Sequence, residues 1–223
     1  DMGLANAQMS MGVRCPYNLS DFLSGDKTLK EIIVTTRQGV KLVPGSSGRQ
    51  DMAALDDLGA ARIVQAFSSL EDPIDVLIVD MAAGIAPSVI TFLAACERRF
   101  VVVRDDPSSI ADAYGTIKIM IQDHGLDEIY LIPNGVGSAQ EGYQLFERIN
   151  NVCARFLNRS VRYLGAIVND EMILQAHKKY MPVLEFAPTS SSSRDFRLLA
   201  KSVLDLPNVE PPSGGLQFFM ERR

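Results

Sequence analysis

The sequence predicts an α/β fold, with a mostly parallel, doubly wound sheet and helices on both of its faces. Short apolar runs alternate along the chain with longer amphipathic stretches, the order expected for strands joined by crossover helices. Runs such as Phe100–Val103 are continuously apolar, which is typical of parallel strands covered on both faces. With 223 residues, of which 47% are hydrophobic, the chain can bury a sizeable core.

The elements follow from these patterns in order. Strands are expected at the short apolar runs Gly39–Pro44, Asp75–Val79, Phe100–Val103, Glu128–Ile132 and Tyr163–Val168. Helices are expected where apolar residues recur near helical spacing, over Met52–Leu70, Val89–Cys96, Ser108–His124, Gln140–Leu157 and Phe196–Val203. Ser108 or Ser109 is expected to cap the third of these helices, and Gly125 is expected to end it.

Composition excludes several classes of protein. A formal net charge of −5 gives no long-range attraction to nucleic acid, so nucleic-acid binding is not expected. Cys15, Cys96 and Cys153 are widely spaced and accompanied by only two histidines, which indicates free thiols in a reducing cytoplasm rather than a zinc site. No apolar run approaches the roughly 18–20 residues that a membrane span needs. A cytoplasmic protein is predicted.

Polar residues follow the ends of several predicted strands. In open parallel sheets, ligands bind beyond the carboxyl ends of the strands. That rule selects Asp80, Arg104, Asp105, Asp106, Asn134, Asn169 and Asp170. Carboxylates and amides suit a metal ion and the edge of a base, although the same residues also occur as ordinary loop polar groups. Asp80 stands out, because an apolar strand that ends in an aspartate and is followed by Gly84 is how nucleoside triphosphatases hold magnesium.

Six segments, in order along the chain, together resemble the MinD/ParA group of deviant Walker-A ATPases, and most closely the flagellar-number regulators called FlhG or FleN. These six segments are Asp1–Asn6 (switch I), Val79–Ile85 (Walker B and switch II), Asp105–Tyr114, Asn134 with Ser138–Gly142, Asp170–Glu171 and Leu216–Arg222. The resemblance implies a P-loop NTPase-like three-layer sandwich in which two subunits enclose ATP.

The resemblance also implies roles for individual residues. Asp80 would hold Mg²⁺ through a coordinated water, and Asp1 would be the catalytic residue that orients the attacking water. The nucleotide would contact Gly3, Asn6, Gly84, Asn134, Asn169 and Asp170, with Asn134 in the adenine-contacting turn and Asp170 in a second base-contacting loop. The dimer or partner face would include Asp106, Pro107, Ser108 and Asp112.

By the same resemblance, the chain is expected to be an ATP-dependent, dimerising regulator of flagellar number or placement. Its cofactors would be ATP and Mg²⁺. Its partners would be a flagellar GTPase of the signal-recognition-particle type and the flagellar transcriptional activator. Two alternatives stay open: a binding module that has lost nucleotide chemistry, for which Gln8 at a usually acidic position argues, and a partition-type ATPase.

The family's glycine-rich loop with two lysines is absent from these 223 residues. We therefore expect an N-terminally truncated ATPase domain over residues 1–206, lacking a strand–loop–helix unit, marginal in stability and inactive as an ATPase on its own. A tail over 207–223 follows. Its Leu216, Phe218 and Phe219 are expected either to pack onto the domain or to form a short amphipathic contact with the inner face of the cell membrane.

Overall fold

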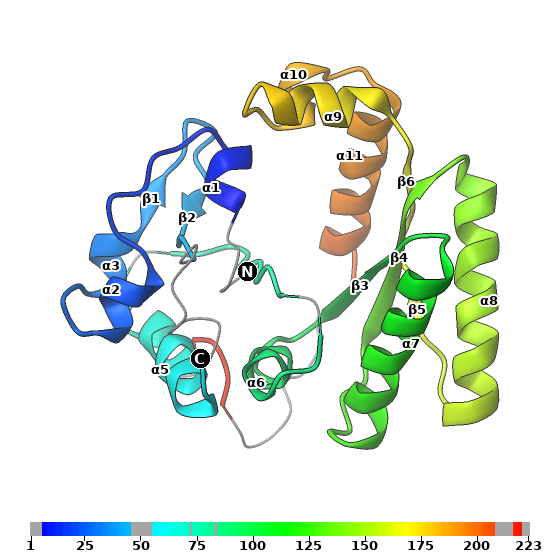
Figure 1. Ribbon diagram of the computed structural model, residues 1–223, viewed down its shortest axis with the longest axis horizontal. Coiled ribbons are helices and arrows are strands. Elements are labelled where there is room, and N and C mark those ends of the chain that lie inside the picture. Colours follow the sequence, from blue (N-terminus) through cyan, green and yellow to red (C-terminus); the bar gives the residue numbers. More distant parts are fainter. Residues whose placement is uncertain (1–5, 46–54, 72, 83, 208–215, 220–223) are drawn as a thin grey trace. The chain divides into compact units, whose positions relative to one another are not determined.

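The computed structural model describes residues 6–45, 55–71, 73–82, 84–207 and 216–219. The chain divides into two compact units (Figure 1). The first unit comprises residues 1–96 and 212–223, and the second comprises the continuous stretch 97–211. Each unit is described by itself. No helix in the described ranges is both long and apolar enough to cross a bilayer.

The first unit is mostly helical in its described part. Its helices are α1 (Ala7–Ser10), α2 (Leu19–Leu23), α3 (Leu29–Ile32), α5 (Asp57–Ser68) and α6 (Pro87–Ala95), and its strands β1 (Val34–Thr35) and β2 (Lys41–Leu42) pair antiparallel. Three of these helices begin at side-chain caps: Asn18 and Asp21 form a capping box at α2, and Thr28 and Glu31 form another at α3. Asp56 caps α5.

The core of this first unit gathers the apolar faces of α2, α3, α5 and α6, with Ile32, Ile63, Val64 and Phe92 almost fully buried. The C-terminal residues Leu216, Phe218 and Phe219 pack against this same core. The ring of Phe218 lies 5.2 Å from that of Phe67 and 6.5 Å from that of Phe92, measured between centroids. Of the two expectations for this part of the tail, packing onto the protein is the one that the structure shows.

The strand predicted at Asp75–Val79 is wrong. This segment forms no ladder with another strand in the described part of the chain. Leu77 and Val79 pack against the core of the first unit, whereas Val76 is 54% and Ile78 85% exposed. The alternation of apolar contacts is that of an extended segment covered on one face. A strand also needs hydrogen-bonding neighbours, which sequence pattern alone does not supply.

The second unit is the parallel α/β part of the fold. Its strands are β3 (Arg99–Val103), β4 (Ile129–Val136), β5 (Arg162–Tyr163) and β6 (Ile167–Val168), and its helices are α7 (Pro107–Gln122), α8 (Ala139–Leu157), α9 (Glu171–Lys178), α10 (Val183–Phe186) and α11 (Ser191–Leu204). Strand β4 is central and pairs parallel with β3, β5 and β6. Its first five residues are buried. Helices α7 and α8 pack on β3 and β4, and α11 packs on β6, so the sheet has helices on both sides, as predicted (Figure 1).

Two local predictions differ from the structure. The single strand expected over Tyr163–Val168 is divided into β5 and β6, because the chain leaves the ladder between them before pairing again with β4. Helix α7 begins at Pro107, one residue before the range expected, and its cap is Asp106 instead of Ser108 or Ser109. The Asp106 carboxylate accepts a hydrogen bond from Ser109 N at 2.9 Å, and proline is suited to the first helical position.

Candidate functional site

The carboxyl edge of the second unit's sheet brings together two of the predicted base-reading residues. Asn134 lies near the end of β4, where it stands in register with Ile167 of β6. Asn169 follows β6 directly, and its backbone N–H donates to Val136 O at 2.7 Å. Asn134 is half-buried and Asn169 is exposed. Two side-chain amides from neighbouring strands therefore lie at one edge, each offering donors and an acceptor.

A bulge at Gly135 adjusts the end of β4 at this point. The register advances by two residues on β4, from Asn134 to Val136, but by only one on β6. Gly135 has a φ of +69°, a conformation that side chains disfavour. A Cβ at Gly135 would lie 3.8 Å from Nη1 of Arg104, which follows β3. Bulges of this kind redirect a neighbouring side chain, here that of Asn134. The Asn-Gly pair was the sequence signal for this feature, and sequence analysis missed it.

An open hollow of about 750 Å³ lies next to this edge. The loop after β6, the start of α9 and the start of α11 line it, and Asn169, Asp170, Arg194 and Leu198 are among its residues. Asn134 is not among them. Arg194 and Leu198 on α11 are site residues that sequence analysis did not select. Their signal was the serine run Ser190–Ser193, which starts a helix beside the predicted loop.

Asp170 is the predicted base-reading residue with the most hydrogen bonds. Its Oδ1 accepts from Met172 N at 2.9 Å, and its Oδ2 accepts from Ser192 N at 3.0 Å and from Ser192 Oγ at 2.8 Å. These bonds, led by that from the Ser192 backbone, lower the pKa of Asp170 from 3.8 to about 2. Asp170 is thus ionised at neutral pH, and its oxygens face α9 and α11.

The predicted dimer-facing residues cluster at the start of α7. Besides Ser109 N, the Asp106 carboxylate accepts the Ser108 hydroxyl at 2.9 Å, and these bonds lower its pKa. Asp112 lies exposed on the same helix. Asp105 forms an ion pair with Arg148 of α8, with Oδ1 and Nη2 2.6 Å apart.

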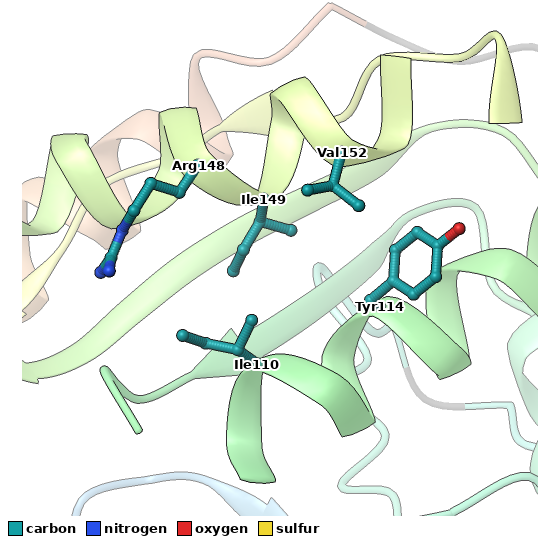
Figure 2. Close-up of a pocket in the computed structure, with 5 residues that line it drawn as sticks. All are labelled: Ile110, Tyr114, Arg148, Ile149 and Val152. Atoms are coloured by element: carbon teal, nitrogen blue, oxygen red, sulfur yellow. The ribbon is translucent and has the colours of Figure 1, made fainter. Parts of the chain in front are cut away.

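Beside this cluster lies an apolar cavity of about 210 Å³ between α7 and α8 (Figure 2). Ile110 and Tyr114 of α7 face Ile149 and Val152 of α8 across it, and Arg148 closes one end (Figure 2). We call these five residues the α7–α8 groove. It presents apolar surface beside an ion pair, an arrangement that sequence analysis did not foresee, because residues on two separate helices contribute to it.

The predicted metal and switch residues belong to the first unit. Asp80 is exposed, at the end of the extended segment that Leu77 and Val79 anchor. Gly84 has a φ of +110° with nothing within 4 Å of an added Cβ, so its backbone conformation calls for glycine. Asn6 precedes α1 without a side-chain capping bond. Asp1 and Gly3 lie outside the described residues.

A single exposed carboxylate fits Mg²⁺ of the kind that nucleotide sites hold. Magnesium prefers oxygen ligands and keeps several waters, and it is commonly bound by one or two carboxylates together with substrate phosphates. No group of three or more histidine, cysteine, aspartate or glutamate side chains that could hold a metal ion occurs in the described ranges. The carboxylate of Asp80 therefore fits a metal shared with a phosphate ligand.

Comparison with solved structures identifies the class of fold. The chain is similar to the cell division ATPase MinD of Pyrococcus furiosus, with a TM-score of 0.73 and 21% identity over 93% of this chain and 84% of that one. It is similar to the septum site-determining protein MinD of Pyrococcus horikoshii, solved with Mg-ADP, with a TM-score of 0.72 and 21% identity over 92% and 81% of the two chains. The fold is that of the MinD-type P-loop NTPases.

Sequence comparison identifies the family within that class. The antiactivator FleN of Pseudomonas aeruginosa is 39% identical over 222 residues, which cover 100% of this chain and 79% of that protein. The flagellum site-determining protein YlxH of Helicobacter pylori is 32% identical over 229 residues, covering 100% and 76%. No family model matches the chain. The chain belongs to the FleN/FlhG family of MinD/ParA-type proteins.

Proposed function

We propose that this chain is the nucleotide-dependent switch of a cytoplasmic regulator of flagellar number or placement. The observation that carries the proposal is the 39% identity to the antiactivator FleN along the whole chain. The second relative, YlxH, is named as determining the flagellar site. The amides of Asn134 and Asn169 at one sheet edge support nucleotide binding, as does the MinD relative solved with Mg-ADP.

For the second unit we propose that Asn134 and Asn169 contact the base of a nucleotide, and for the first unit that Asp80 holds a magnesium ion. Mg²⁺ would neutralise the charge that develops on the phosphate oxygens during transfer. Gly84 lets the backbone approach the terminal phosphate, because it has no Cβ and adopts a positive φ. Asp1 orients the attacking water. ATP hydrolysis then turns off the binding of partners, since the contacts that depend on the terminal phosphate are lost.

Dimerisation is assigned to the start of α7. Asp106, Pro107 and Ser108 form a fixed helix start, and Asp112 is exposed one turn beyond it. A rigid, capped helix end is a suitable interface element because its ordering costs no further entropy on association. We propose that ATP brings two copies together through this segment.

The α7–α8 groove is proposed as the surface that contacts the flagellar transcriptional activator. The relative FleN is named an antiactivator, which favours such a partner. The groove offers apolar side chains for the apolar face of a partner helix. Substituting Val152 by aspartate is expected to abolish co-purification of the activator. Phe156→Asp, an exposed aromatic outside the groove, is the matched control.

ATP turnover tests the switch. In the whole protein that contains this chain, Asp80→Asn and Asp1→Ala are each expected to lower the ATP hydrolysis rate by about 100-fold or more. Asp75→Asn makes the same change of charge at the other end of the extended segment and should leave the rate unaltered. An unmodified protein that binds ATP, dimerises and does not hydrolyse it would favour the alternative of a binding module. Absence of nucleotide binding would refute the proposal.

A further inference from the structure

The loop that carries Asn169 is held in place by bonds on both sides of that residue. Before it, Val168 N donates to Oδ2 of Asp195 on α11, at 3.0 Å. At the residue itself, the backbone N–H donates to Val136 O of β4. After it, Asp170 accepts hydrogen bonds from α9 and from α11. The backbone of Asn169 therefore has little freedom, although its side chain is exposed.

The Asp170 carboxylate is committed to this anchoring. A carboxylate offers about four lone-pair sites, and three hydrogen bonds already occupy this one. Two of the three donors belong to Ser192, which lies 22 residues further along the chain. A base would have to compete with these donors for the same oxygens. The carboxylate is consequently better suited to fixing the loop than to reading a ligand.

Asn169, by contrast, is exposed and lines the hollow together with Arg194 and Leu198. An amide carries donors and acceptors that match the edge of a purine base. Its usefulness depends on where the loop places it, because a hydrogen bond weakens steeply when its geometry is poor. The bonds made by the residues on either side of Asn169 determine that placement.

We propose that Asp170 and Ser192 form a positioning clamp for Asn169, so that a serine of α11 sets how well the site recognises the nucleotide base. Asp170 is then a positioning residue and not a base-contacting one, which revises the role that the resemblance implied. The inference rests on the proposed nucleotide-binding function and adds to it the determinant of base recognition.

The serine run at the start of α11 supports this division of roles. Ser192 and Ser193 are completely buried, whereas Ser191 is exposed. Ser190 caps the helix by accepting from Ser193 N, and the Ser193 hydroxyl donates to Val183 O of α10. Ser192 donates its hydroxyl to Asp170 Oδ2 at 2.8 Å, and a side-chain hydrogen bond from Ser190 also lowers the pKa of Asp170. Ser193→Ala removes an equally buried hydroxyl that donates to α10, so it is a matched control for Ser192→Ala.

Nucleotide binding by the whole protein tests the clamp. Dissociation constants are measured with fluorescent N-methylanthraniloyl analogues of ATP and GTP. Asn169→Ala is expected to weaken ATP binding roughly tenfold and to reduce the preference for ATP over GTP. Ser192→Ala should reduce the same preference by about threefold or more, and Ser193→Ala should not. The double variant Asn169→Ala/Ser192→Ala should bind ATP no more weakly than Asn169→Ala alone, because both changes remove the same interaction with the base.

A merely structural role for Ser192 would give a different result. Binding of ATP and GTP would weaken equally, and the double variant would show the sum of both effects; either outcome overturns the proposal. Asp195→Ala, which releases Val168 from the other side, provides a second route to the same loss of preference if Ser192→Ala fails to fold. Should the unmodified protein bind no nucleotide at all, the proposed function itself fails. Normal nucleotide binding with unchanged preference in Ser192→Ala and Asp195→Ala refutes only the clamp.

Discussion

The ring of Phe218 meets the ring of Phe67 edge to face, with centroids 5.2 Å apart and an interplanar angle of 84°. Phe67 belongs to α5, and Phe218 comes from the far end of the chain. Edge-to-face pairs contribute about 0.5–1.5 kcal/mol beyond the area that they bury. The C-terminal segment thus stabilises the core of the first unit.

This contact predicts that Phe218→Ala destabilises the protein. Truncating a fully buried phenylalanine to alanine lowers the free energy of unfolding by about 3–5 kcal/mol. Because Phe218 is only half-buried, a loss of about 1–3 kcal/mol is expected. Urea unfolding followed by circular dichroism gives the free energy. Phe156→Ala, which removes a 62% exposed ring, is the control and should change stability by less than about 1 kcal/mol. Equal losses in both variants would contradict the prediction.

Two glycines on different helices, Gly142 and Gly115, give a second prediction. A Cβ at Gly142 of α8 would lie 2.6 Å from Ala166 Cβ and 3.3 Å from Val136 Cγ2, so Gly142→Ala forces α8 away from the sheet. A net loss of about 1–3 kcal/mol is expected from overpacking. At Gly115 of α7 the same substitution meets nothing within 4 Å. Gly115→Ala should therefore stabilise the protein by about 0.5–1 kcal/mol through helix propensity. Thermal denaturation of the two variants should show shifts of opposite sign.

Two aspartates near the start of α7, Asp106 and Asp112, are expected to affect different properties of the protein, namely its stability and its dimerisation. Asp106→Ala removes the acceptor for Ser109 N and should cost about 0.5–2 kcal/mol. Asp112→Ala removes an exposed carboxylate of the same helix and should leave the free energy of unfolding within about 0.5 kcal/mol. Any effect of Asp112→Ala on the sedimentation of the ATP-bound protein then reports on the interface. A stability loss in Asp112→Ala as large as that in Asp106→Ala would remove this distinction.

Lowering the pH should reduce the free energy of unfolding, partly through protonation of Asp170. Its pKa in the folded state, about 2, lies below its ordinary value of 3.8, so the carboxylate stabilises the fold fully above the ordinary value. That contribution is lost as the pH falls from about 4 toward 2. Asp170→Asn should therefore be less stable than the unmodified protein at neutral pH, and the difference should shrink over this range. Unfolding free energies measured at several pH values test it, and a difference that stays constant down to pH 2 would contradict it.

Sequence pattern predicted the second unit well because its signals are local. The apolar run around Val101 and the amphipathic stripe of α8 each specify one element, and parallel pairing follows from their alternation. The expected cover on both faces of β3 was wrong, however, because Phe100 is 40% and Val102 58% exposed. The carboxyl-edge rule then placed Asn134 and Asn169 together. The positions of Asp1 and Gly3 are not described, and their roles stay predictions.

What sequence pattern missed depends on contacts between distant residues. Asp170 was selected correctly as a residue of this edge, but its hydrogen bonds to Ser192 involve a helix start 22 residues away. The segment before Asp80 has the composition of a buried strand. Ile78 is nevertheless exposed, because only the face that carries Leu77 and Val79 packs against the core. Local propensity does not show whether a neighbouring strand is present to pair with this segment, so it cannot predict whether the segment forms a strand.

The packing of Phe218 on the first unit also determines the order in which the two units can complete their folding during synthesis. Residues 97–211 form a continuous unit and can complete their sheet as soon as they leave the ribosome. The first unit is completed later, because Phe67 and Phe92 meet Phe218 only after residues 97–211 have been made. During this interval its aromatic residues stay uncovered, and a chain that stops early after residue 207 would never cover them. Addition of the segment that carries Phe218 is therefore a late step in completing the core of the first unit, and quality-control proteases should distinguish chains that have this segment from chains that lack it.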